Sequence, residues 1–268
     1  MMPVKKEPSG RRSVQTEVDV PGTPEAVWEA IATGAGISSW FVPAEVDGRV
    51  GGRTVCHFGP GDSMDSVATI TEWQPPQRFA AETEEGPGAI ATEWIVEAKE
   101  GGTCTVRVVH SWFADSDDWD SQFEGHAGGW VSFFKILRFY LEHFPGEEST
   151  LVQLAAQSDD TVDAAFNRLM GPLGVEHGAD GQAVASDADA PQLAGNVLEA
   201  LNTPEGFSVI LRLDKPVPAI AHMIGFPMGG PVHVSVRFYL YGAEAARVAG
   251  KVEADWRKWL EERFPVQA

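Results

Sequence analysis

Length, composition and charge narrow the possibilities for this chain. With 268 residues, it exceeds the size at which a single hydrophobic core usually stops growing, so two domains are expected. A formal net charge of −19 disfavours contact with phosphate backbones and anionic lipid headgroups, so neither nucleic acid nor a membrane surface is an expected partner.

Cysteine content and hydropathy bear on metal binding and on the compartment. Cys56 and Cys104 are the only two cysteines, and each lies in an apolar, strand-like run. Two cysteines at this spacing form neither a disulfide framework nor a structural zinc site, and we expect no metal. No apolar stretch reaches about 18 residues, and no apolar signal core lies near the start. A cytoplasmic location is therefore expected.

The first part of the chain predicts a tail, a strand and two short helices. Residues 1–12 carry prolines and four basic side chains and are predicted to be a disordered tail. Residues 14–20 alternate as a half-buried strand does. Thr23 followed by Pro24 is typical of a helix N-terminus, and a second short helix is expected over residues 36–41.

The next segment, up to Phe113, predicts an antiparallel meander. Short apolar runs alternate with turns that contain glycine, proline or aspartate, as in consecutive strands joined by tight connections. The last strand has a clear phase, with Cys104, Val106, Val108, His110 and Trp112 on one face. The predicted strands are Arg53–Phe58, Ser66–Trp73, Arg78–Thr83, Ala91–Glu97 and Thr103–Phe113.

A long helix is predicted over residues 126–144. Its apolar residues follow the i, i+3, i+4, i+7 rule, and further aromatic side chains widen the stripe until only a narrow charged edge remains. A helix that is apolar over most of its circumference must be enclosed, and the preceding sheet is the expected partner. The stripe consists of Trp130, Phe133, Phe134, Leu137, Leu141 and Phe144.

The second half repeats this plan in reduced form. Val152 and Thr161 match Val14 and Thr23 at one constant offset. Alternating runs at 207–213 and 234–240 precede another amphipathic helix that contains Trp256 and Trp259. Residues 176–192, rich in alanine, aspartate and glycine, are predicted to be a loop. We infer a tandem duplication whose second copy has lost strands. The expected domains are residues 13–146 and 150–268.

These elements and several motifs together resemble a known superfamily. The carrying residues are Thr23-Pro24-Glu25-Ala26-Val27-Trp28-Glu29-Ala30-Ile31, Ile37-Ser38-Ser39-Trp40-Phe41, Gly51-Gly52, Val109-His110-Ser111-Trp112-Phe113 and His126-Ala127-Gly128-Gly129-Trp130. Together they resemble the SRPBCC (START-like) superfamily, in the branch homologous to the C-terminal domain of the Hsp90 ATPase activator. The resemblance covers about residues 13–145 and is weak in the second half.

The resemblance implies a fold and a general function. The fold is α+β, a helix-grip (START/Bet v 1-like) antiparallel sheet wrapped around a long C-terminal helix, here duplicated. The implied function is binding of a small apolar ligand in an internal cavity. A polyketide cyclase/dehydratase-like enzyme is the alternative, and an Hsp90-activator-like co-chaperone with a chaperone partner is a second alternative. The superfamily includes all of these, because a fold does not fix a function.

Motifs of the well-marked enzyme classes are absent from the sequence. It contains no phosphate-binding glycine loop, no H-E-x-x-H, no C-x-x-C and no G-x-S-x-G, and we expect no cofactor. His110 is the candidate catalytic residue, because an imidazole in an apolar pocket can transfer protons. A core histidine bonded to backbone or water is the more frequent situation and the preferred interpretation.

Aromatic side chains are the expected ligand-binding residues. Some of them are expected to fill the core and others to line the cavity. Trp119 and Phe123 belong to the acidic segment before the long helix, which in helix-grip folds commonly edges the opening. The candidate set is Trp40, Phe58, Trp73, Trp94, His110, Trp112, Trp119, Phe123, Trp130 and Phe133.

Overall fold

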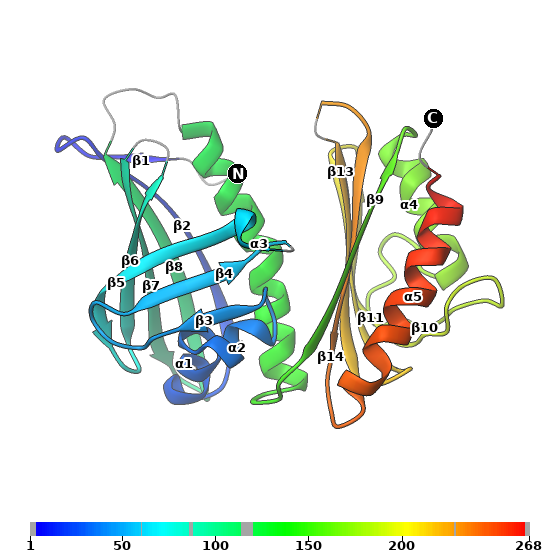
Figure 1. Cartoon of the computed structure of the whole chain (residues 1–268), viewed down its shortest axis with the longest axis horizontal. Coiled ribbons are helices and arrows are strands. Elements are labelled where there is room, and N and C mark those ends of the chain that lie inside the picture. Colours follow the sequence, from blue (N-terminus) through cyan, green and yellow to red (C-terminus); the bar gives the residue numbers. More distant parts are fainter. Residues whose placement is uncertain (1–3, 60, 86–87, 114–119, 228, 266–268) are drawn as a thin grey trace. The chain divides into compact units, whose positions relative to one another are not determined.

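The structure is a computed structural model, and it describes residues 4–59, 61–85, 88–113, 120–227 and 229–265. The chain divides into two compact units, Met1–Glu148 and Ser149–Ala268. Each unit contains one antiparallel sheet and one long helix at its C-terminal end (Figure 1).

The first unit is built on an eight-stranded antiparallel sheet with the order β1-β2-β8-β7-β6-β5-β4-β3. From β3 to β8 the strands follow one another along the chain, and β2 then pairs with β8. The five predicted strands of the meander are confirmed, with β7 longer at both ends than expected. The strands are β1 Lys5–Lys6, β2 Arg11–Pro21, β3 Ala44–Val46, β4 Arg53–His57, β5 Asp65–Gln74, β6 Arg78–Glu85, β7 Gly88–Lys99 and β8 Thr103–Phe113.

Two short helices, α1 Pro24–Ala32 and α2 Gly34–Ser38, follow β2. The Thr23 hydroxyl accepts a hydrogen bond from the Ala26 amide at 3.3 Å, which confirms the predicted N-cap. The helices approach so closely that a β-carbon on Gly36 would lie 1.9 Å from the Glu29 carbonyl oxygen. This approach requires glycine, and it sets the direction in which the following residues, Trp40 and Phe41, enter the core.

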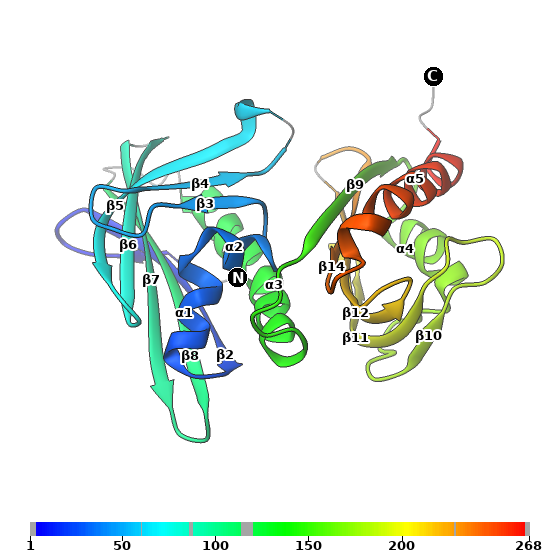
Figure 2. The ribbon, with the colours of Figure 1, turned by 60° about the horizontal axis from the view of Figure 1, so that its bottom comes forward.

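The long helix α3 extends over Asp120–His143, so it begins six residues before the predicted start. Its apolar stripe lies against the sheet, and Phe134, Ile136, Leu137 and Tyr140 are almost completely buried. Helix α3 contacts β2 extensively. The predicted wrapping of a sheet around a terminal helix is therefore present in this unit (Figure 2).

The prediction of a disordered tail over residues 1–12 is wrong for residues 4–12. Lys5 and Lys6 form a short strand that pairs with β2, and β2 itself begins at Arg11. The Arg12 guanidinium donates to both carboxylate oxygens of Asp120, at 2.8 and 2.7 Å, and Lys6 adds an ion pair at 2.9 Å. Basic residues that suggest a solvated tail thus hold the start of α3.

The second unit has a six-stranded antiparallel sheet with the order β10-β11-β12-β13-β14-β9. Helices α4 and α5 lie on one face of it, and the core between them is one continuous apolar cluster that includes Phe166, Phe238 and Trp256 (Figure 2). The elements are β9 Thr150–Ser158, α4 Val162–Met170, β10 Ala183–Ala185, β11 Ala194–Thr203, β12 Gly206–Lys215, β13 Ala219–Pro227, β14 Val232–Leu240 and α5 Ala245–Arg263.

The second unit confirms the inferred duplication with fewer strands and corrects details. The threonine N-cap of α1 is repeated at α4. The Thr161 hydroxyl accepts a hydrogen bond from the Ala164 amide at 3.3 Å, as the Thr23 hydroxyl does from the Ala26 amide in the first copy. Strands β11 and β13 were not predicted. Strand β13 is buried on both faces, so its sequence does not alternate. Residues 176–192 are mainly turns, but they also contain β10, which is paired with β11.

The ion pair between Arg12 and Asp120 gives a stability prediction. Both side chains are nearly buried, so Arg12→Ala leaves a poorly solvated carboxylate and is expected to destabilise the first unit by about 2 kcal/mol. Urea unfolding followed by tryptophan fluorescence measures the change. Lys99→Ala is the matched control, because the Lys99–Asp19 pair is solvent-exposed and should contribute little. Equal effects of the two substitutions would contradict the prediction.

Candidate functional site

The first unit contains a pocket of about 520 Å³ between its sheet, α2 and α3. Its described lining carries no aspartate, glutamate, lysine or arginine. The lining is provided by Ile37, Trp40, Phe41, Thr54, Cys56, Phe58, Ser66, Ala68, Phe79, Ala81, Thr83, Thr92, Trp94, His110, Gly129, Trp130 and Phe133.

One part of the pocket wall is aromatic, and its rings support one another. Phe41 contacts two aromatic residues of α3 in the lining, with ring centroids 5.1 Å from Trp130 and 4.5 Å from Phe133. Trp94 on β7 meets Trp130 edge-on at 5.1 Å. The Trp40 indole N–H donates to the Ala30 carbonyl at 2.9 Å, so this buried ring is fixed in orientation. The result is an apolar wall in which neighbouring rings hold one another in place.

The sheet side of the pocket carries hydroxyl groups. Thr54, Ser66 and Thr83 come from three neighbouring strands, β4, β5 and β6, and all three are partly exposed. No hydrogen bond from these hydroxyls to another described residue is recorded. Each hydroxyl can donate and accept, so this wall suits a ligand that carries oxygen atoms on one edge.

His110 is bound on both ring nitrogens. The Trp130 indole can only donate, so its 2.7 Å contact makes Nε2 of His110 the acceptor. Nδ1 then carries the proton and donates to the Thr92 hydroxyl oxygen, 2.9 Å away. The ring also stacks on Trp130, with centroids 6.1 Å apart. The imidazole is therefore a neutral, fixed bridge between β7, β8 and α3, and the partners shown here are side chains and not the backbone or water of the preferred interpretation.

Cys56 contributes the one thiol of the described lining. Burial raises the pKa of its thiol to about 11. At neutral pH it is therefore protonated and behaves as a small apolar group. The second cysteine, Cys104, is also buried, and its Sγ contacts the Gly22 carbonyl at 3.4 Å.

The structure brings six of the ten predicted site residues together around the pocket: Trp40, Phe58, Trp94, His110, Trp130 and Phe133. Trp73 and Trp112 lie elsewhere, contrary to the prediction. Trp73 packs against Trp28 and Phe79, at centroid distances of 5.0 and 5.5 Å. Trp112 is buried in a separate small cluster with Val14. Trp119 and the side chain of Phe123 lie outside the described residues.

Sequence reasoning missed several lining residues. Phe41 and Phe79 lie within predicted elements, but nothing in the sequence indicates which way their rings point. The small hydroxyl residues Thr54, Ser66 and Thr83 carry no signal by themselves. Their alternation with outward-facing residues on β4 to β6 is the one pattern that identifies them.

Among the described residues, no group of three or more histidine, cysteine, aspartate or glutamate side chains could hold a metal ion. Within the same part of the chain, no helix is both long enough and apolar enough to cross a bilayer.

Residues 21–142 match the family model described as Activator of Hsp90 ATPase homolog 1-like protein. This range contains the whole described lining of the pocket. The first domain of the chain belongs to this AHSA1-like family, within the SRPBCC superfamily. No curated protein matches the chain.

Solved structures with a similar arrangement have low identity. The di-domain ARO/CYC BexL from the BE-7585A biosynthetic pathway is 13% identical, with a TM-score of 0.45, and the match covers 96% of this chain and 100% of BexL. DynU16, from the dynemicin biosynthetic locus, is 17% identical, with a TM-score of 0.41 and coverage of 94% and 97%. The Aha1 dimer from Colwellia psychrerythraea is 20% identical, with a TM-score of 0.42, and the match covers 50% of this chain and 98% of the Aha1 chain. Identities and scores at this level carry no information about activity.

The raised pKa of Cys56 gives a reactivity prediction. In a Cys104→Ser background, iodoacetamide should modify native Cys56 far more slowly at pH 8 than the unfolded chain, because only about one thiol in a thousand is ionised. The rate should rise about tenfold per pH unit between pH 8 and 10. Mass spectrometry follows the labelling. Modification at the rate of the unfolded chain would contradict this description of the pocket wall.

The bridge between His110 and Trp130 gives a second prediction. In a double-mutant cycle, His110→Leu and Trp130→Phe should each destabilise the first unit, with a coupling energy of about 1 kcal/mol. Chemical denaturation measures all four proteins. If the two effects simply add, the bridge contributes nothing and the assignment of the acceptor nitrogen is wrong.

Proposed function

We propose that the first domain binds a neutral, largely apolar small molecule in this pocket. The observation that carries the proposal is a lining that combines rigid aromatic rings with hydroxyl groups and has no charged side chain among its described residues. A volume of about 520 Å³ is within the range of small-molecule sites, on the order of 300–1,000 Å³. An ionised ligand would lose hydration without gaining a counter-ion, so a neutral ligand is favoured.

The two walls suggest how such a ligand lies. A flat, conjugated ring system would stack on Phe41 and Trp130, where aromatic contact adds about 0.5–1.5 kcal/mol for each ring pair. Hydroxyl or carbonyl oxygens along one edge of the ligand would meet Thr54, Ser66 and Thr83. We therefore propose a polycyclic or aryl compound with oxygen substituents on one side. Fatty acids are poorer candidates, because their carboxylate has no partner here.

The contacts of His110 favour binding over acid–base catalysis. A cyclase/dehydratase-like enzyme needs a group that can exchange protons with its substrate, and His110 is the imidazole of the described lining. Both of its nitrogens already have partners in Thr92 and Trp130. Catalysis through His110 would require Trp130 to turn away first.

The family of the first domain is the observation that favours a chaperone partner instead. That hypothesis requires no pocket. Addition of the chain to a purified Hsp90-type ATPase separates the two functions: stimulated ATP hydrolysis that survives a filled pocket would support the co-chaperone.

A filled-pocket variant tests the binding proposal. Ala68 lines the pocket on β5, and Ala68→Phe should abolish binding of compounds that raise the melting temperature of the native chain by several degrees. The test is a thermal-shift and tryptophan-quenching screen of neutral aryl and polycyclic compounds. Ala91 on β7 adjoins the lining residue Thr92 and lies on the other face of the sheet, away from the pocket. Ala91→Phe is therefore the matched control and should leave binding unchanged. Absence of any stabilising compound, or equal binding by both variants, would refute the proposal.

A further inference from the structure

Each of the two sheets has two edge strands, and three of the four are very short. In the first unit the edges are β1, with two residues, and β3, with three. In the second unit one edge is β10, with three residues, but the other is β9, with nine. Short edges expose few backbone groups to other chains. Strand β9 departs from this pattern.

Strand β9 also lacks the usual features that protect an edge. Its sequence, Thr150 to Ser158, contains no charged residue and no proline. Its pairing with β14 is continuous over all nine positions, without a bulge. Natural proteins normally use charges, prolines or bulges to prevent pairing at such a strand. Their absence from a chain with a net charge of −19 is therefore informative.

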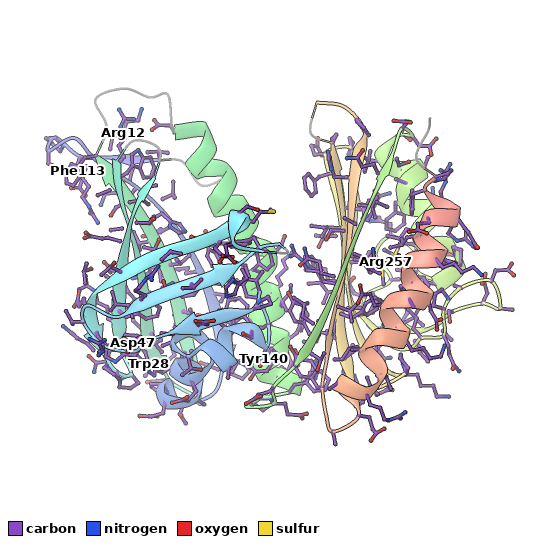
Figure 3. All side chains as sticks on the ribbon, viewed as in Figure 1. Arg12, Trp28, Asp47, Phe113, Tyr140 and Arg257 are labelled. Atoms are coloured by element: carbon purple, nitrogen blue, oxygen red, sulfur yellow. The ribbon has the colours of Figure 1, made fainter. Side chains whose placement is uncertain are left out.

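The outer side of β9 has no strand partner within its own unit. Among the described residues, no recorded backbone hydrogen bond joins residues 151–157 to any strand other than β14. Gln153, Ala155 and Gln157 are exposed. A groove of about 550 Å³ is lined by residues of β9, β13, β14 and α5, and Figure 3 shows Arg257 on that helix. The groove is lined by Leu154, Ala155, Ala156, Gln157, Phe226, His233, Val234, Ser235, Arg257, Leu260, Glu261 and Phe264.

The groove has two features that a bound strand would use. Leu154, Leu260 and Phe264 form an apolar floor on the α5 side, which suits alternate side chains of an added strand. The lining has two charged residues, Arg257 and Glu261, and Arg257 is paired with Glu253 at 2.6 Å. Glu261 and Asp159, which is exposed and directly follows β9, form no recorded ion pair with the described residues, so the rim at this end of the strand is acidic.

We propose that β9 is a binding site for an extended, basic segment of another protein. The segment adds to the sheet as an antiparallel or parallel seventh strand, through main-chain hydrogen bonds to residues 151–157. Its alternate apolar side chains enter the groove between β9 and α5. A lysine or arginine at its ends lies near Glu261 and Asp159. The partner is thus recognised by its extended backbone, by the alternation of its apolar side chains and by its positive charge.

Charge distinguishes this partner from a second copy of the chain. Two-fold pairing of β9 with itself brings two acidic rims together, and each copy has a net charge of −19. In addition, Glu147 and Glu148 precede the strand in the sequence, and Asp159 and Asp160 follow it. Like charges at both ends of a paired strand are unfavourable. A basic partner removes this repulsion.

The test uses the full chain and a fluorescent peptide of about seven residues, with alternating valine and threonine and a lysine at each end. Fluorescence anisotropy should show saturable binding. Methylation of alternate backbone nitrogens removes the main-chain donors on one edge and should weaken binding at least about tenfold, because several main-chain hydrogen bonds are lost together. Glu261→Lys should weaken binding about fivefold. Glu262→Lys, with the same change in net charge one residue away, should have little effect.

Several outcomes would overturn the proposal. No binding at about 1 mM peptide would do so, as would equal affinities of the methylated and unmethylated peptides. Equal effects of Glu261→Lys and Glu262→Lys would show unspecific charge attraction. Sedimentation velocity provides one more outcome: a dimer of the chain that is disrupted by Ala155→Lys would assign the edge to self-association. Circular dichroism checks that the variants, all at exposed positions, remain folded.

Discussion

Trp130 on α3 donates its indole N–H to His110 on β8, and this bond holds the helix at the side of the pocket. Sheet and helix are joined here by a directional contact, whereas most of their contact is apolar and non-directional. The same contact fixes the tautomer of the imidazole, and the Thr92 hydroxyl completes the bridge by accepting from Nδ1. The open space depends on this contact, because the two aromatic residues of α3 in the lining, Trp130 and Phe133, keep their positions only while the helix does.

The pocket and the rest of the first core use the same residue types differently. Trp28 and Trp73 pack against each other away from the pocket, and both contact Phe79, which belongs to the lining. Trp94 and Trp130 present their rings to the pocket, and neighbouring rings hold them in place. A void of this size loses dispersion contacts, and the tight packing around it offsets part of that loss.

The two copies of the fold differ in the number of strands, in their edge strands and in their cores. The first copy has eight strands, short edges and an internal pocket. The second copy has six strands, a continuous apolar core and a long, uncharged edge at β9. Loss of strands reduces the sheet area that can curl around a terminal helix. The proposed binding sites differ accordingly, with the interior of the first copy and the outer edge of the second.

The sequence by itself determined the periodic elements. Alternation located β8 and β14, the apolar stripe located α3, and the threonine caps revealed the duplication, because these signals depend on neighbours within a few residues. Tertiary structure decided the rest. Residues 4–12 are ordered because Arg12 meets Asp120, more than a hundred positions away in the chain. Trp112 shares a strand face with His110, yet only His110 reaches the pocket. The alternation along a strand predicts the face of the sheet on which a side chain lies. The position of α3 over that face decides whether the side chain packs in the core or lines the pocket.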